Sequence, residues 1–189
     1  MDVPSEELAA LALAAQRGEA ASRDALIRVI RPAVLRYVLA RGLRDHDADD
    51  VTQDVCVAVL QAVDRWRDEG RPVWAVVFAI VRNKLADLGR QQVRQKEALC
   101  DDMTVHDAPR HDTPSELVER DEAAAGVSEL LDSLPPTQRD VLTLRVIVGL
   151  TCAETAEALG LTVGSVRVIQ YRGMTALRRR LGSEKAVAS

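Results

Sequence analysis

Aromatic residues, cysteines and long apolar runs are all scarce in this chain of 189 residues. Aromatic side chains make up 3% of it, and no apolar run approaches the roughly 20 residues that cross a bilayer. No stretch alternates apolar and polar residues as a strand would. The apolar 47% is mostly alanine, valine and leucine, which favours helices. We therefore expect an all-helical protein, with two cores of modest size rather than one large core.

The cysteines and histidines form no pattern that predicts a disulfide framework, a metal site or a catalytic site. The cysteines are odd in number and widely spaced, and the histidines lack the spacing of metal ligands. These residues are Cys56, Cys100, Cys152, His46, His106 and His111. The first 15 residues carry acids rather than the basic start of a signal peptide. We therefore expect a cytoplasmic protein that is not an enzyme, with no catalytic residues, no metal and no cofactor.

The charge is unevenly distributed, although the net charge is only −4. Two stretches, 82–96 and 160–182, are rich in basic residues and nearly free of acids, which is typical of phosphate-binding segments. Acidic residues and two prolines dominate the sequence between them. We interpret 97–113 as an acidic, flexible linker between domains at 1–96 and 114–189. Whether its acids act or only space the domains stays open.

Residues 150–172 have the pattern of a helix-turn-helix. Thr151 and Glu154 can form a capping box, and Gly160 can end the first helix in the left-handed conformation. Val163 and Val166 are expected to face the core from the second helix. That would leave Thr162, Ser165, Arg167 and Arg172 free to meet phosphates and base edges in a major groove. The alternative is a helical hairpin in an ordinary core.

Helices are also expected in the first half of the chain. Ser5 can cap a helix over 6–16, and Pro32 predicts a break or kink in a helix over 24–43. A third helix, from Asp45 to about residue 63, places three polar residues on one face because of their spacing. These residues are Asp50, Gln53 and Asp54.

An arginine-rich loop over 65–72 contains Trp66 and precedes a helix over 74–92 that becomes basic toward its end. A tryptophan among arginines can stack on single-stranded bases while the charges hold the backbone. The alternative is that Trp66 and Trp74 anchor the core.

Three motifs together resemble one family. The segment 47–55 (DADDVTQDV) resembles the polymerase-binding motif of bacterial sigma factors of the extracytoplasmic-function (ECF, group 4) class. The segment 78–88 resembles the family's −10-reading helix, and the segment 134–145 followed by the helix-turn-helix resembles its −35-binding domain. The C-terminal block also resembles the DNA-binding domain of response regulators. The N-terminal motifs are therefore what distinguishes a sigma factor from a response regulator here. Within the family the chain looks most like the sigma-D-like actinobacterial members.

The resemblance implies two small helical domains and a role for each of the singled-out residues. It implies that Asp50, Gln53 and Asp54 bind a coiled coil of the polymerase β′ subunit. The residues it assigns to the −10 element are Trp66, Arg67, Arg71, Asn83, Lys84 and Asp87. The residues it assigns to the −35 element are Thr162, Gly164, Ser165, Arg167, Val168 and Arg172. Arg167 is the candidate for a bidentate contact with guanine.

The partners that the resemblance implies are the polymerase core, through its β and β′ subunits, and promoter DNA. It also leaves room for an anti-sigma factor. One departure is that the family usually has a tryptophan at the position of Val76, whereas this chain has Trp74. Two rival functions remain: a stand-alone dimeric helix-turn-helix regulator that binds a palindrome, and a helical adaptor that binds only protein.

Overall fold

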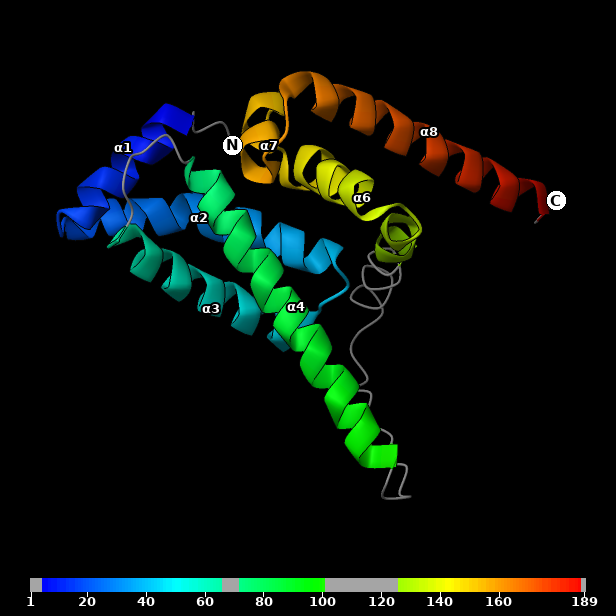
Figure 1. Cartoon of the computed structure of the whole chain (residues 1–189), viewed down its shortest axis with the longest axis horizontal. Coiled ribbons are helices and arrows are strands. Elements are labelled where there is room, and N and C mark those ends of the chain that lie inside the picture. The colour runs from blue at the N-terminus through cyan, green and yellow to red at the C-terminus, as the bar shows by residue number, and fades with distance from the viewer. Residues whose placement is uncertain (1–4, 66–71, 101–125, 188–189) are drawn as a thin grey trace, which may run out of the picture.

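The computed structural model describes residues 5–65, 72–100 and 126–187, and every regular element in those ranges is helical. This confirms the all-helical prediction. The elements are α1 (Ser5–Gln16), α2 (Ala20–Ala40), α3 (Asp45–Val63), α4 (Val73–Cys100), α6 (Pro136–Leu142), the π-helix η1 (Thr143–Val148), α7 (Cys152–Leu159) and α8 (Val163–Val187), with a further helical stretch over 126–132 (Figure 1). None of the described helices is long and apolar enough to span a membrane.

Helices α1 to α4 form the N-terminal half, in which α2 packs against both α1 and α3 (Figure 1). The stripe of α2 that its sequence pattern predicts is buried, including Leu26, Ile30 and Val34. Pro32 lies inside α2, which continues to Ala40, so the predicted break does not occur. Burial of α2 between its two neighbours offsets the one hydrogen bond that a proline cannot donate.

Helix α4 is longer than the sequence pattern predicts. It was expected over 74–92 but runs from Val73 to Cys100, and its last four residues fall in the segment expected to be linker. The rest of that segment, 101–113, lies outside the described residues, as does the loop 66–71. Helix α4 therefore extends well past the body of the N-terminal half (Figure 1).

The C-terminal half contains α6, η1, α7 and α8. The π-helix η1 was not predicted; it ends at Gly149, whose φ of +89° is the left-handed conformation that favours glycine. Arg145 of η1 donates hydrogen bonds to the Leu150 carbonyl and to Gln170 Oε1, the latter at 3.1 Å. One arginine thus ties η1 to the following loop and to α8.

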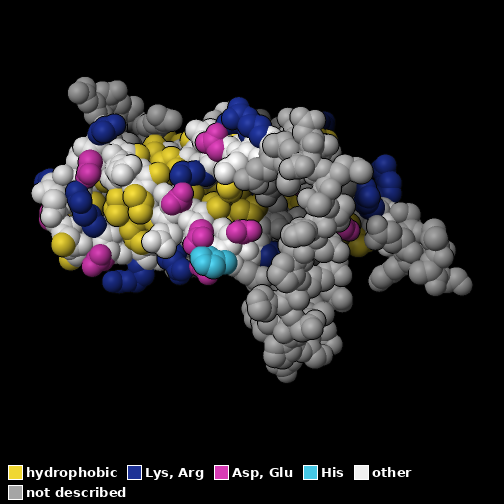
Figure 2. Space-filling view, turned by 90° about the horizontal axis from the view of Figure 1, so that it is seen from below, with side chains coloured by type: hydrophobic (Ala, Val, Ile, Leu, Met, Phe, Trp, Pro, Cys, Tyr) yellow, Lys and Arg dark blue, Asp and Glu magenta, His cyan; other side chains and the backbone are white. Residues whose placement is uncertain are grey.

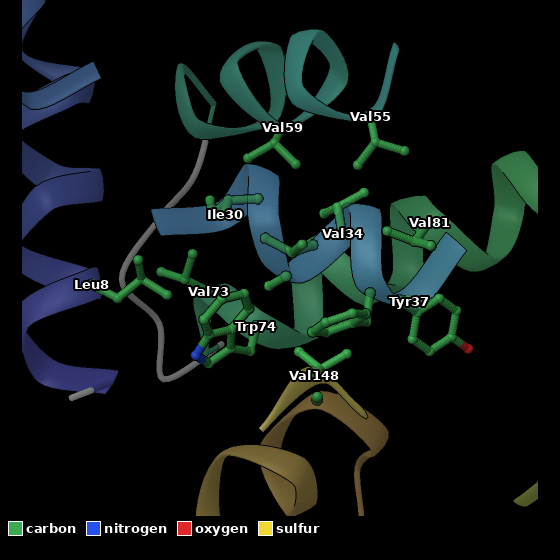
Figure 3. Packing of buried hydrophobic residues seen from close by; sticks show 14 of the residues in the cluster. Leu8, Ile30, Val34, Tyr37, Val55, Val59, Val73, Trp74, Val81 and Val148 are labelled. Atoms are coloured by element: carbon green, nitrogen blue, oxygen red, sulfur yellow. The ribbon is translucent and has the colours of Figure 1, made fainter. Parts of the chain in front are cut away.

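The largest cluster of buried side chains crosses between the two halves, where the sequence led us to expect separate cores. Leu144 and Val148 of η1 belong to the same cluster as Tyr37, Trp74 and Phe78. Figure 3 shows Val148 on the side of this cluster where Trp74 and Tyr37 lie. The Phe78 ring lies 5.3 Å from the Tyr37 ring and 5.7 Å from the Trp74 ring, between centroids. Trp74, 3% exposed, is therefore a core anchor. Three of the chain's five aromatic residues meet here, and η1 completes their burial.

Candidate nucleic-acid and protein interfaces

The turn between α7 and α8 has the local chemistry that the sequence predicts. Thr151 Oγ1 accepts a hydrogen bond from the Glu154 amide at 3.2 Å, and Glu154 Oε2 accepts one from the Thr151 amide at 2.7 Å. This is the predicted capping box. Gly160 ends α7 at φ +66°, and Val166 of α8 is fully buried. The geometry is that of a helix-turn-helix.

The start of α8 differs from the prediction. Val163 was expected to face the core but is 37% exposed, because it stands in the first turn, where Leu161 of the preceding loop packs against the buried cluster instead. Thr162 caps the helix: its Oγ1 accepts from the Ser165 amide at 3.1 Å and lies 2.8 Å from Ser165 Oγ. A threonine before the first helical residue is the signal that could have predicted this cap.

The outer face of α8 carries basic and apolar groups. Arg167, Val168 and Arg172 are exposed, as is Gly164, and no acidic residue occurs over 160–182. Tyr171 on the same face is 71% exposed, and it is not among the residues predicted from the sequence. Its spacing from Arg167 and Val168, four and three residues, could have revealed it. This face can offer a guanidinium fork, an apolar surface and a ring to one ligand.

The predicted acidic face of α3 lies over a groove between α3 and α4. Asp50, Gln53 and Asp54 are all exposed and line this groove, which has a volume of about 570 Å³. Its other lining residues are Leu43, Asp47, Val51, Leu88 and Gln91. Figure 2 shows acidic side chains near a histidine and beside apolar groups on the face seen there. The groove thus combines an apolar floor with negative charge at its rim.

Two of these acids already lie against nitrogen-bearing side chains of this chain, a histidine and a lysine. Asp50 Oδ2 lies 3.1 Å from His46 Nδ1, and Asp54 Oδ2 accepts a hydrogen bond from Lys84 Nζ at 2.9 Å. A hydrogen bond with its own backbone, and then the Asp50 carboxylate, raise the pKa of His46 above its usual value. Both pairs are exposed, so a basic side chain of a partner can replace His46 or Lys84 at little cost.

The residues expected to meet the −10 element fall into two groups. Asn83 and Asp87 are exposed on α4, where Asp87 pairs with Arg90, and Lys84 reaches across to Asp54. The structure thus brings a predicted DNA contact, Lys84, against a predicted polymerase contact. The loop residues Trp66, Arg67 and Arg71 lie outside the described part of the chain.

Nothing in the described ranges is arranged to hold a metal ion: no group of three or more histidine, cysteine or acidic side chains is close enough. Cys56 is buried and Cys152 is half-buried, both as free thiols. Burial raises the pKa of the Cys56 thiol, which keeps it protonated and unreactive. These two cysteines act as small apolar groups in the packing.

Two family models match the chain in the order of its halves. The model described as Sigma-70 region 2 matches residues 26–95, which include α3 and most of α4. The model described as Sigma-70, region 4 matches residues 130–179, which include the helix-turn-helix.

Curated relatives cover nearly the whole chain. The ECF RNA polymerase sigma factor ShbA of Streptomyces griseus is 39% identical over 178 residues, which are 90% of this chain and 93% of the relative. The ECF RNA polymerase sigma factor SigD of Mycobacterium tuberculosis is 36% identical over 186 residues, with coverage of 94% and 85%. The similarity to SigD agrees with the sigma-D-like resemblance of the sequence.

Solved structures have the same arrangement of helices. CnrH in complex with the cytosolic domain of CnrY matches with a TM-score of 0.67 and 28% identity, covering 92% of this chain and 96% of that one. The sigma factor RpoE of Bartonella quintana, in complex with the anti-sigma factor NepR, matches in fold with a TM-score of 0.55 and 19% identity. With the helix-turn-helix and the acidic α3 face in the family's order, this chain belongs to the ECF RNA polymerase sigma factors.

Proposed function

We propose that the chain holds polymerase core through the α3 face and reads a promoter at two points, the −10 element through α4 and the −35 element through α8. As a sigma factor, the chain binds RNA polymerase core and promoter DNA and directs transcription initiation. The assignment of each role to particular residues is our proposal. The charge of those residues supports it, as does the exposure of most of those that the structure describes.

The polymerase-binding role of Asp50, Gln53 and Asp54 is supported by the groove that they line. Two carboxylates and an amide at the rim can accept hydrogen bonds from basic side chains, and the apolar floor can receive an aliphatic one. A helix of the β′ subunit with basic and apolar residues on one face fits this chemistry. The β subunit would be contacted elsewhere on the chain.

The −10 role of α4 is supported by its charge. Asn83 and Lys84 can donate hydrogen bonds to bases or phosphates, and Asp87 can accept one from a base amino group. We propose that the loop residues Trp66, Arg67 and Arg71 capture an unpaired base beside them. Capture of an extruded base would select the promoter and help to melt it.

One observation gives the strongest support to the −35 role of α8. Its outer face is exposed and basic, and no acidic residue occurs along 160–182. Arg167 can make two hydrogen bonds to guanine, and Val168 can contact a thymine methyl group. Thr162, Gly164 and Ser165 form the helix start, whose backbone amides can face a phosphate. Arg172, one turn further along, can reach the backbone.

Four further proposals concern the whole chain rather than particular residues. We propose that the chain acts in the cytoplasm and performs no catalysis, because the chemistry of transcription belongs to the polymerase. The proposed domain division remains 1–96 and 114–189, with 97–113 as the tether. Because the CnrH and RpoE structures hold CnrY and the anti-sigma factor NepR respectively, we also propose a protein partner of the anti-sigma kind for this chain.

The direct test is transcription by purified polymerase core with and without the protein. We expect promoter-dependent transcripts only when the protein is present. Asp54→Arg should weaken core binding at least about tenfold, because opposing like charges costs several kcal/mol. Core affinity is measured by fluorescence anisotropy, and far-UV circular dichroism checks that the helices remain.

Asp64→Arg is the matched control, because Asp64 also pairs with a cation of a neighbouring helix, Arg23, but lies at the end of α3 away from the groove. Equal loss of core affinity in both variants would overturn the assignment of the α3 face. Tight binding of a palindromic duplex without core would instead favour a stand-alone regulator, and binding without any dependence on DNA would favour an adaptor.

A further inference from the structure

We propose that Arg145, in the π-helix η1, is a positioning residue for promoter recognition. It fixes the angle between the two helices of the helix-turn-helix, and thereby the alignment of Arg167 with the bases of the −35 element. Arg145 acts in this way through the groups that it binds within the chain, rather than by touching DNA. This inference rests on the −35 role proposed above for α8.

Arg145 is bonded to both helices of the motif through one side chain. Its Nη1 donates a hydrogen bond to the carbonyl of Leu150, the residue directly before Thr151, which caps α7. Its Nε donates to Gln170 Oε1 in the first half of α8, at 3.1 Å. The guanidinium group is planar and rigid, so these two donors have fixed directions relative to each other. The start of α7 and this part of α8 are therefore held in one mutual orientation.

The backbone around Arg145 is also held firmly. The Gly149 amide donates to the Leu144 carbonyl five residues back at 3.0 Å, and the Leu150 amide donates to the same oxygen at 2.9 Å. Leu144 is fully buried, and Gly149 has a left-handed backbone. A single π-helical turn interrupts the α-helical order of side chains and is frequently found at functional sites. The η1 turn is thus a fixed base from which the Arg145 side chain reaches α8.

The apolar contacts of α8 determine its orientation less sharply. Val166 and Ile169 pack in one cluster with residues of α6 and α7, and Leu177, further along, packs in another. Hydrophobic contact is non-directional, so it holds the helix against its neighbours without fixing small rotations. Gln170 lies between these two groups along α8. Its hydrogen bond with Arg145 supplies the directional contact at this point.

Gln170 is next to a proposed base contact on the surface of α8. It follows Arg167 by three residues, a spacing that makes two residues neighbours on a helix, and it is half-buried whereas Arg167 is exposed. A recognition contact has to be held within about 0.5 Å and 10–20° of its productive geometry. A phosphate contact depends mainly on charge and tolerates more freedom. Loss of the Arg145 contact should therefore weaken sequence recognition more than general affinity for DNA.

The test compares holoenzymes that contain variants of the full-length chain. Wild-type holoenzyme first selects duplexes from a library with a random −35 segment, and the selected duplex is compared with one that carries transversions there. Gln170→Met removes the acceptor for Arg145 without changing the charge. The ratio of the two affinities, measured by fluorescence anisotropy at fixed salt, should fall at least about fivefold, the lower end of what a bidentate base contact contributes.

This ratio separates positioning from a merely structural role, because a partly unfolded variant would lose active protein equally on both duplexes. Gln170→Glu keeps an oxygen for Arg145, so it should retain the ratio although its charge weakens binding to both duplexes. Thr175→Val is the matched control on α8, because Thr175 Oγ1 donates to the Tyr171 carbonyl of the same helix at 2.9 Å. Thr175→Val should leave the ratio unchanged.

Arg145→Met and the double variant with Gln170→Met complete a double-mutant cycle. If the two residues act as a pair, the double variant should lose no more discrimination than Arg145→Met alone. Additive losses would mean that the residues act independently, and would overturn the proposal. In the free chain, nuclear magnetic resonance should show that the Arg145 Nε proton exchanges with water faster in Gln170→Met than in wild type.

The failure of this proposal differs from the failure of the −35 assignment. If wild type selects a −35 sequence and Gln170→Met keeps the same ratio, the positioning role is overturned and the −35 reading by α8 stands. If wild-type holoenzyme selects no −35 sequence, the −35 reading is rejected and the positioning role with it. Equal proton exchange in wild type and Gln170→Met would reject the contact itself, whatever DNA the holoenzyme binds.

Discussion

Arg167 and Val168 are neighbours on the exposed face of α8, yet they can contribute differently to DNA recognition. An arginine fork can donate two hydrogen bonds to the O6 and N7 atoms of guanine, whereas a valine offers only contact with a methyl group. Val168 is 49% exposed, as several other apolar side chains of the described residues are, so its exposure alone does not mark a binding site. The proposed recognition role of the pair rests on its place beside the helix-turn-helix turn and on the basic, acid-free sequence around it.

Arg167→Ala should relax the preference for the −35 sequence more than it weakens binding to unrelated DNA. The loss of a bidentate contact costs about 1–3 kcal/mol of discrimination against the wrong base. The measurement is holoenzyme affinity for matched and mutated −35 fragments at a fixed salt concentration.

Arg178→Ala, on the same helix and also exposed, is the comparison variant. It should weaken binding to all sequences evenly if it contacts only phosphate. If Arg167→Ala lowered the affinity for every fragment equally, Arg167 would contact only phosphate, as Arg178 is expected to do.

At the scale of elements, features that depend on nearby residues were predicted correctly. The capping box of Thr151 and the left-handed Gly160 follow from local backbone chemistry, and both are confirmed. The burial of Val163 was predicted wrongly, because Leu161 of the preceding loop, which helical periodicity does not include, packs against the buried cluster instead. The π-helix η1 has no local signal in the sequence. It lies where α6 runs into the contact with the N-terminal half.

Helix α8 approaches α6 closely at Gly173, and this predicts a destabilising substitution. A Cβ at this position would lie 2.9 Å from Leu142 Cδ1, and Leu142 is 2% exposed and cannot move away freely. Gly173→Ala should therefore lower the free energy of unfolding by about 1–3 kcal/mol, the usual cost of overpacking. Chemical denaturation followed by circular dichroism measures it.

Gly182→Ala tests the same replacement in the same helix, where nothing lies within 4 Å of the added atom. It should leave stability unchanged or raise it by up to about 1 kcal/mol through helix propensity. If Gly173→Ala did not lower the free energy of unfolding, α6 and α8 would be able to move apart without loss of stability.

At the scale of the whole molecule, the sequence predicted the parts but not their contact. The exposed faces of α3 and α8 follow from periodicity and charge, and the family resemblance supplied their order. The contact between the halves depends on pairs such as Tyr37 and Asp140, which are 103 positions apart. No local pattern specifies such a pair, since either residue could equally have faced water.

Val148→Ala should loosen the N-terminal half as well as η1, because Val148 shares a core cluster with Trp74 and Phe78. Removing two buried methyl groups costs about 1–3 kcal/mol. Hydrogen exchange should therefore speed up at the start of α4, far away in the sequence.

Val146→Ala is the control within η1, because Val146 is 58% exposed and should leave exchange in α4 unchanged. If Val148→Ala changed exchange only within the C-terminal half, the shared cluster would not couple the halves.

The separation of Tyr37 from Asp140 also affects how the protein emerges from the ribosome. Tyr37 is synthesised 103 residues before its hydrogen-bond acceptor. At about 5–20 residues per second, roughly 5–20 seconds pass between the synthesis of Tyr37 and that of Asp140. During that interval the growing chain presents apolar surface to chaperones, so its yield should depend on them more than that of a protein whose core is built from neighbouring residues.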